Sequence, residues 1–440
     1  MKNTKMMVVG FVSAVAVSLI LSTSLFAKNT VAAPTEASVE ASRLQSLAKF
    51  TKVLSIVEQY NVDGLTVDQL IDKSLQGMLS NLDAHSTYMD KKSYDNLKTQ
   101  TDGEFGGLGI TVGMRDNALT VIAPIEGTPA DKAGIKAGDI ILKINDKSTL
   151  SMTIDDAVSI MRGAPKTPID LTIVRKGLAD PLKIHIIRDI ITVQSVYTRT
   201  ISGNILYIRV TSFDKKVAAD VKKAIKKYSG KSKGIILDLR NNPGGLLDQA
   251  VDLTDLFVDE GTIVSQKGRN KADDMTYKAT KSNTITDLPL VVLVNEGSAS
   301  ASEIVSGALQ DLKRAVIVGE KTFGKGSVQV VMPITETEGI KLTVARYYLP
   351  SGRTIQAVGV TPDIEVAAGE IKKHEKSFNI KEADLKEHLV SELEKSDGMI
   401  DVTEANATNK TVITPDQMNR DIQLKEGVDI IKALIIVKGK

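Results

Sequence analysis

The stretch LVVLVNEGSASASEIVSGALQDL, residues 290–312, decides the fold of this chain. It begins with the apolar run Leu290–Val294, which is typical of a fully buried strand. A turn rich in Gly, Ser and Ala follows, and the pattern then predicts a helix over residues 303–312. A buried strand that leads directly into a helix is the repeating unit of a parallel α/β sheet.

The same order of strand and helix occurs twice before this stretch. Ile205–Val210 is followed by a helical pattern over Val217–Tyr228, and Ile235–Leu239 by one over Leu246–Leu256. A further short strand is predicted at Ala315–Val318. The alternation predicts a mostly parallel α/β core, in which functional sites form at the carboxyl ends of the strands.

The regions on the N-terminal side of this core have other patterns. Residues 28–100 carry apolar residues at helical spacing, and Thr66 is the expected N-cap of a helix over Val67–Leu79. Residues 101–190 instead show short strand patterns with glycine turns and one helix pattern, Ile154–Met161. We therefore expect a helical region and then a separate, strand-rich domain.

The ends of the chain are also distinct from the core. Residues 367–440 are polar and charged, with helical character over 371–396 and an apolar stretch over 430–437. At the other end, two lysines precede an apolar segment, so residues 1–27 are expected to be either a secretory signal peptide or a membrane anchor. With either alternative, the rest of the chain is exported.

Composition excludes several classes of site. The chain has 440 residues, a net charge of +2 and no Cys, so disulfides and thiol catalysis are excluded. The balanced charge shows no bias toward nucleic acid as a partner. The four histidines are scattered, which argues against a His-based metal site. They are His85, His185, His374 and His388.

A serine and a lysine offer the chemistry of a hydrolase. Ser298, Ser300 and Ser302 alternate before the predicted helix, so their spacing alone does not choose a nucleophile. A serine hydroxyl needs a base, and an amine can serve as one only where burial lowers its pKa. Lys325 lies between two glycines with apolar neighbours, and no histidine is near it in the sequence. The pattern therefore favours a Ser/Lys dyad.

Two further features would complete such a site. The predicted helix begins just after the serines, so its backbone N–H groups can stabilise an oxyanion, and Gly244 or Gly245 can supply a second donor. Gln329 follows Lys325 by four residues and can orient its amine. Taken singly, these features also fit an ordinary N-cap, a solvated lysine and a turn, so the hypothesis depends on their joint occurrence.

Four blocks of the sequence resemble the carboxy-terminal processing peptidases, an exported bacterial family of Ser/Lys peptidases with a PDZ domain. The blocks are residues 82–88, residues 105–110 with 133–145, residues 237–245, and residues 295–309 with 319–329. The resemblance implies that Ser300 is the nucleophile, Lys325 the general base and Gln329 its support. It also implies oxyanion donors on the backbone of Ala301 and of either Gly244 or Gly245.

The resemblance also implies an architecture. It places a crotonase-like α/β peptidase core at residues 191–366, with parts of the N-terminal region, and an inserted PDZ domain at residues 101–190. Helical N- and C-terminal segments, 28–100 and 367–440, flank these domains. Such a PDZ domain binds the C-terminus of a substrate as an added strand, and its carboxylate loop would be Gly106, Gly107, Leu108, Gly109 and Ile110.

The expected biology follows from the same resemblance. The family cleaves exported proteins near their C-termini without a metal or cofactor, which places this chain in the periplasm, soluble or anchored at the inner membrane. The terminal helices suggest a homo-oligomer, and some relatives use a helical-repeat adaptor lipoprotein. Arg162, at the end of the predicted PDZ helix, is a hypothetical link between peptide docking and catalysis, although an ordinary surface arginine fits the same position.

Two other functions remain open at this point. One is a PDZ scaffold that has kept the fold without catalysis. The other is a His-dependent PDZ protease, which would have to use a histidine such as His85. His85 lies in the predicted helical region, so a structural role is the simpler expectation for it.

Overall fold

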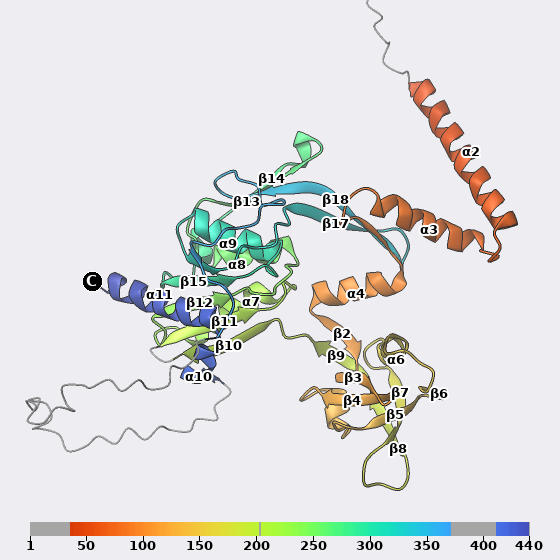
Figure 1. Ribbon diagram of the computed structural model, residues 1–440, viewed down its shortest axis with the longest axis horizontal. Helices are drawn as coiled ribbons and strands as arrows, with labels where there is room; N and C mark the ends of the chain where they lie inside the picture. The colour runs from red at the N-terminus through yellow and green to blue at the C-terminus, as the bar shows by residue number, and fades with distance from the viewer. Residues whose placement is uncertain (1–35, 202–203, 371–410, 440) are drawn as a thin grey trace, which may run out of the picture. The chain divides into compact units, whose positions relative to one another are not determined.

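The computed structural model describes residues 36–201, 204–370 and 411–439 (Figure 1). The chain divides into two units, Met1–Asn81 and Leu82–Lys440. The expected signal segment and the predicted helix over 371–396 lie outside the described residues. Within the described ranges, no helix is long and apolar enough to span a bilayer.

The first unit consists of helices α2 (Glu36–Tyr60) and α3 (Val67–Ser80). Thr66 caps α3 as predicted, since its hydroxyl accepts a hydrogen bond from the Gln69 backbone N–H and the Gln69 side chain accepts one from the Thr66 N–H. Leucines and other apolar side chains along α2 are exposed within the unit.

The second unit starts with strand β1 (Thr87–Met89) and helix α4 (Lys91–Asp102), which lead into the strand-rich domain. Its main sheet has the order β3-β4-β5-β7-β8, with β6 paired to β5, and β2 and β9 form a separate two-stranded sheet. The strands are β2 (Glu104–Gly107), β3 (Ile110–Arg115), β4 (Ala118–Pro124), β5 (Ile140–Ile144), β6 (Lys147–Ser148), β7 (Pro168–Val174), β8 (Leu182–Ile187) and β9 (Asp189–Thr192). The short helices α5 (Pro129–Lys132) and α6 (Ile154–Met161) complete this domain, which has a hydrophobic core of its own.

The central sheet has the order β19-β16-β15-β12-β11-β10-β20. Its members are β10 (Val196–Ile201), β11 (Ile205–Val210), β12 (Gly234–Asp238), β15 (Leu290–Val294), β16 (Val316–Gly319), β19 (Ile364–Glu365) and β20 (Val412–Ile413). All neighbouring pairs are parallel except β10 with β11, which confirms the predicted mostly parallel sheet.

Helices cover both faces of this sheet (Figure 1). One face packs on α7 (Val217–Lys227), α8 (Leu247–Asp255) and α9 (Ala301–Asp311). The other face packs on α10 (Pro415–Asn419) and α11 (Ile422–Lys438). Side chains alternate between the two faces along each strand, so every strand residue of β12 and β15 is buried.

A second, antiparallel sheet was not predicted from the sequence. It has the order β1-β18-β13-β14, and β17 pairs with β18. Its other strands are β13 (Thr262–Gly268), β14 (Met275–Lys278), β17 (Ser327–Pro333) and β18 (Gly339–Tyr348), and two 3-10 turns, Lys271–Asp273 and Lys281–Asn283, lie nearby. Figure 1 shows α8 and α9 between this sheet and the central sheet, and the shared core includes Val328 and Tyr347.

Candidate active site

Ser300 lies where β15 ends and α9 begins. It is the N-cap residue of α9, with φ of 54° and ψ of −111°, and the residue is 7% exposed. A positive φ in a residue with a Cβ costs on the order of 1–3 kcal/mol, and such strain clusters at functional sites. The turn therefore holds one serine in an unfavourable conformation at a helix N-terminus.

The neighbouring serines have structural partners. The Ser298 hydroxyl donates to the Leu239 carbonyl oxygen at 2.8 Å, and the Ser302 hydroxyl donates to the Asn242 carbonyl oxygen at 2.9 Å. The Ser300 hydroxyl donates to no acceptor within the described parts of the chain. These contacts separate the three serines that sequence spacing left equivalent, because Ser300 alone of the three donates to no described acceptor.

The loop after β12 passes directly beside Ser300. A Cβ added to Gly244 would lie 2.8 Å from the Ser300 Cβ, so only glycine fits here. The Gly244 N–H already donates to the Asn242 side-chain oxygen at 2.9 Å. The N–H groups of Gly245 and Ala301 have no acceptor among the described residues, so these two are the backbone donors that remain available for an oxyanion.

Glu303 connects the serine segment to the lysine segment, and the sequence analysis missed it. Its side chain is fully buried and accepts four hydrogen bonds. Two come from the backbone N–H groups of Ser300 at 2.8 Å and Lys325 at 2.9 Å. The others come from the Thr322 hydroxyl at 2.6 Å and the Gly324 N–H at 2.7 Å. One carboxylate thus fixes the backbone of both proposed catalytic residues.

Lys325 is half-buried in the loop before β17. Burial lowers the pKa of its amine, and the charge of Lys341 lowers it further, while Glu303 acts in the opposite sense. The pKa of the Lys325 amine is therefore shifted in the direction that the sequence predicted. The Lys325 amine and the Ser300 hydroxyl, both in the described part of the chain, are not hydrogen-bonded to each other here. Catalytic contacts often tighten only when substrate binds.

Gln329 lies on β17 and has partners other than those expected. Its side-chain nitrogen donates to the Ser327 hydroxyl at 2.8 Å and to the Thr343 hydroxyl at 3.2 Å. The expected contact with the Lys325 amine is not made in this structure. Because both hydrogens of the amide are used, its oxygen Oε1 is the group left to accept from an amine.

A hydrogen-bond chain continues from Gln329 to a distant segment. The Thr343 hydroxyl donates to Asp83 at 3.0 Å, and the Ser86 hydroxyl donates to the same carboxylate at 2.5 Å. The Ser86 contact is the main cause that lowers the pKa of Asp83 to about 2. In the sequence, the segment around Asp83 contributed only to the family resemblance. In the structure, it is linked through Thr343 to Gln329, near the proposed base.

His85 lies within the predicted helical region but between two of its helices, α3 and α4. It occupies a bend between α3 and β1 and is half-buried. Burial lowers the pKa of its imidazole, with a further contribution from the charge of Lys325, and Asp83 opposes both. His85 is therefore close enough to Lys325 to sense its charge, which sequence spacing gave no reason to expect.

A cleft of about 720 Å³ runs beside these residues. Gly245 and Gln329 lie in its wall, and β17 borders it with an edge that pairs with no other described strand. Much of the remaining lining is apolar: Leu246, Leu247, Val328, Val330, Val344 and Tyr347. An extended peptide can therefore reach the proposed oxyanion donor along an apolar surface.

The chain is similar to known proteins over most of its length. The model of peptidase family S41 matches residues 204–366, that of a PDZ domain residues 120–175, and that of the activating protease CtpB N-terminal domain residues 7–93. A carboxy-terminal-processing protease of Bartonella bacilliformis is 42% identical over 403 residues, which cover 90% of each chain. This chain belongs to the carboxy-terminal processing protease family.

Two further comparisons give the breadth of the family. The carboxy-terminal processing protease CtpA of Bacillus subtilis is 37% identical over 323 residues, covering 72% of this chain and 69% of the relative. The solved structure of a photosystem II D1 C-terminal processing protease is 28% identical, covers 72% of this chain and 92% of that chain, and has a TM-score of 0.42. As a member of family S41, this carboxy-terminal processing protease is a serine peptidase with a PDZ domain.

The predicted carboxylate loop of this protease lies between two strands. Gly106 and Gly107 belong to β2, Leu108 and Gly109 connect the two strands, and Ile110 begins β3. Gly109 has φ of 77°. The N–H groups of Leu108 and Gly109 have no acceptor among the described residues, and α6 packs against β3. These two N–H groups are therefore not used by the described residues.

Arg162 is the C-cap residue of α6, and its hydrogen bond and ring contact are not with the serine or the lysine. Its Nη1 donates to the Asn96 side-chain oxygen at 2.9 Å, and its guanidinium lies 4.8 Å from the centre of the Phe105 ring. Arg162 therefore joins the PDZ helix to α4, the helix whose Tyr94 and Leu97 line the cleft.

Proposed function

We propose that this chain is an exported serine endopeptidase that docks substrate C-termini in its PDZ domain and cleaves peptide bonds with a Ser/Lys dyad. The observation that carries the proposal is the shared carboxylate of Glu303, which binds the backbone of both Ser300 and Lys325. A buried side chain that joins these two segments has a clear use if they act together. A scaffold without catalysis has no such need.

In the proposed mechanism, the neutral Lys325 amine removes the proton from the Ser300 hydroxyl as its oxygen attacks the scissile carbonyl carbon. The tetrahedral oxyanion accepts hydrogen bonds from the N–H groups of Gly245 and Ala301. The Lys325 ammonium then gives its proton to the leaving amine, and the C–N bond breaks. Water, deprotonated by Lys325, hydrolyses the acyl-enzyme and restores the Ser300 hydroxyl.

Gln329 supports the base in this mechanism through the acceptor oxygen that its own hydrogen bonds leave available. Serine and threonine hydroxyls hold its nitrogen, so Oε1 is presented with a fixed orientation. When substrate binding brings the Lys325 amine toward Ser300, Oε1 can accept one of the amine hydrogens. The lone pair of the neutral amine then faces the serine hydroxyl.

Substrate selection in this proposal has two parts. The apolar cleft favours substrates with apolar side chains near the scissile bond, and the free edge of β17 can pair with an extended chain. The substrate carboxylate would bind the N–H groups of Leu108 and Gly109 in the PDZ domain. Through its hydrogen bond to Asn96, Arg162 would couple peptide binding in the PDZ domain to the position of α4, which lines the cleft.

Location and assembly complete the proposal. The N-terminal segment directs the protease to the periplasm as a cleaved signal or as an inner-membrane anchor. Apolar side chains exposed along α2 at helical spacing support self-association or an adaptor lipoprotein as the use of this helix. They include Leu44, Leu47, Phe50, Val53 and Ile56. The core, with its parallel sheet and covering helices, is proposed to be crotonase-like.

Cleavage of casein tests the dyad directly. We would compare the chain without its first 27 residues with the Ser300→Ala, Lys325→Ala and His85→Ala forms. The first two variants are expected to lose activity by about 10⁴-fold or more, since the members of a catalytic unit act together. Activity that persists in Ser300→Ala would refute the nucleophile assignment. Loss of activity in a folded His85→Ala protein would instead favour a His-dependent protease.

A further inference from the structure

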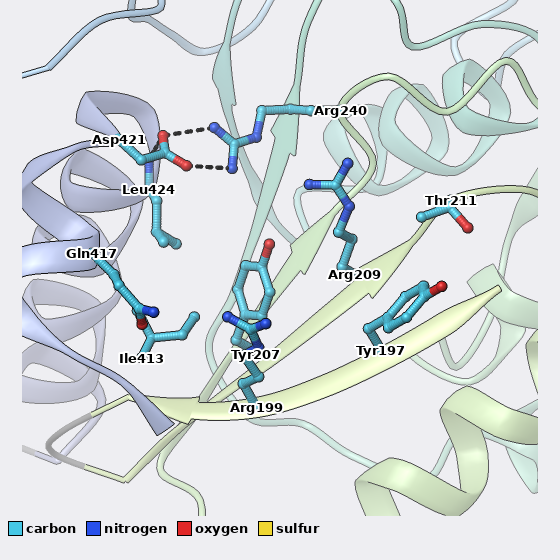
Figure 2. Close-up of a pocket in the computed structure, with 10 residues that line it drawn as sticks. All are labelled: Tyr197, Arg199, Tyr207, Arg209, Thr211, Arg240, Ile413, Gln417, Asp421 and Leu424. Carbon is cyan, nitrogen blue, oxygen red and sulfur yellow. Dashed lines mark hydrogen bonds and ion pairs between the residues drawn. The ribbon is translucent and has the colours of Figure 1, made fainter. Parts of the chain in front are cut away.

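A second cavity, of about 520 Å³, lies over the other face of the central sheet from α8 and α9 (Figure 2). Strands β10 and β11 form its floor, and the segment from β20 to α11 forms one wall. None of its lining residues belongs to the proposed catalytic set. Its polar lining is dominated by Tyr197, Arg199, Tyr207, Arg209, Arg240 and Asp421.

Strand register explains why arginines and tyrosines gather here. In the antiparallel pair of β10 and β11, Tyr197 lies opposite Arg209 and Arg199 opposite Tyr207. Residues two apart on a strand share a face, as do directly opposed residues, so these four side chains project from the same side of the sheet. Arg199 and Arg209 are diagonal neighbours, about 7–8 Å apart in typical sheets, which long side chains span easily. Figure 2 shows both arginine side chains on the cavity side of strands β10 and β11.

The third arginine differs from these two in its partners. Arg240 is buried and donates to Asp238 and, through Nη1 and Nη2, to both oxygens of Asp421 at 2.7 and 2.8 Å (Figure 2). The Tyr207 hydroxyl donates to the same Asp238 at 2.7 Å. The carboxylates at this site are therefore already engaged by Arg240.

Arg199 and Arg209 have no hydrogen-bond or ion-pair partner within the described residues. With three guanidinium groups and two carboxylates, the immediate surroundings of the cavity keep a net positive charge. Arg209 is half-buried, and its guanidinium has no hydrogen-bond acceptor in the described residues, although the Asp421 carboxylate lies close enough to be affected by its charge. A bound anion would supply that acceptor.

We propose that this cavity binds a phosphate ester, with its phosphate between Arg199 and Arg209. Each guanidinium is a planar fork of N–H donors, and a phosphate monoester offers three oxygens, enough to accept from two forks at once. Ile413, Leu424 and the Tyr197 ring give the cavity apolar walls beyond the arginines. The ligand should therefore carry an organic body as well as its phosphate.

The position of Arg240 gives this site a route to the proposed catalytic centre. Arg240 lines the cavity and begins the loop that continues to Gly244 beside Ser300. The loop is fixed at this end by the contacts of Arg240 with Asp238 and Asp421. A phosphate ester would thus bind next to the base of the loop without touching the serine or the lysine.

Calorimetric titration of the purified full-length protein tests the proposal. The probes are AMP, dihexanoyl phosphatidic acid, and adenosine as the matched ligand without phosphate. We expect saturable 1:1 binding of at least one phosphate ester and none of adenosine. The tighter of the two phosphate esters tells whether the natural ligand is a soluble metabolite or a lipid headgroup.

Substitutions then decide whether the arginines are responsible. Arg199→Gln/Arg209→Gln should weaken binding by about tenfold or more, since two charge-assisted contacts are lost. Arg115→Gln/Arg269→Gln removes the same charge from exposed positions elsewhere and should leave binding unchanged. Arg199→Gln alone, on an exposed side chain, serves if the double variant does not fold. No binding of either ester, or equal weakening by both double variants, would overturn the proposal.

Discussion

The two segments that meet at the proposed dyad are built in different ways. The serine segment is local, because strand, turn and helix follow one another within residues 290–312. The lysine segment depends on remote partners, since Gln329 contacts Thr343 and Thr343 contacts Asp83, 260 positions away. The turn of the proposed nucleophile is thus formed by consecutive residues and anchored to the loop after β12 through Ser298 and Ser302, whereas the segment of the proposed base is tied to the remote Asp83 across the antiparallel sheet.

Because of this difference, substitutions near Ser300 and substitutions near Lys325 should have different effects on folding and activity. The strained turn at Ser300 is enforced by the fully buried start of α9, so small changes around it should affect folding as well as activity. The surroundings of Lys325 are half-buried, so changes there should alter the protonation and orientation of the base while the fold remains. Four substitutions test this contrast.

The largest effect is expected for Glu303→Gln, which disturbs both segments at once. The amide offers only one acceptor oxygen and places an NH₂ group against backbone N–H donors, so buried donors lose their partner. Activity should fall by at least about 100-fold, and the free energy of unfolding by roughly 2–3 kcal/mol. Casein cleavage and urea denaturation measure the two effects. Glu296→Gln, an exposed residue of the same turn, is the control. Near-normal activity in Glu303→Gln would show that the carboxylate does not join the segments functionally.

A smaller effect should follow from Thr343→Val, which removes one hydroxyl without changing the shape of the side chain. Gln329 then loses an acceptor and Asp83 a donor. We expect kcat to fall by about tenfold with KM unchanged, because the base loses orientation in the transition state. Thr343→Ser should restore most of the rate. A rise in KM with constant kcat, or no rescue by serine, would argue against a role in orientation.

These contrasts also explain how much the sequence predicted. The bounds of Ile205–Val210 and Leu290–Val294 are confirmed to the residue, because buried apolar runs end where polar turns begin. Strand β18 was missed, since one of its faces is partly exposed and its residues alternate in polarity without a long apolar run. Glu303 looked like an ordinary first-turn residue, because its partners in the 322–325 loop come together only in the folded chain.

The electrostatic part of the lysine site can be tested separately by pH. The charge of Lys341 lowers the pKa of the Lys325 amine. Lys341→Met should therefore raise that pKa, and since only the neutral amine acts as base, the rise of activity with pH should move to higher pH. On the acid limb the variant should be several-fold slower, and at high pH equal to the parent. Lys278→Met removes an exposed lysine of the same sheet as a control. An unmoved profile would mean that a group other than Lys325 controls it.

The smallest effect is expected where the PDZ domain meets the rest of the protease. Arg162 bonds to Asn96 of α4 and covers the Phe105 ring, while its contacts do not include the serine or the lysine. Arg162→Ala should leave basal cleavage of casein unchanged and reduce its stimulation by an added C-terminal peptide by about fivefold, a modest coupling between two sites. Arg115→Ala, on the exposed end of β3, is the matched control. If Arg162→Ala equals the parent with and without peptide, the arginine is a surface residue, and peptide docking must reach the cleft by another route. If basal cleavage falls as well, Arg162 stabilises α4 and the cleft even without peptide. The residues that support the proposed lysine base would then include this arginine, which makes no hydrogen bond to it.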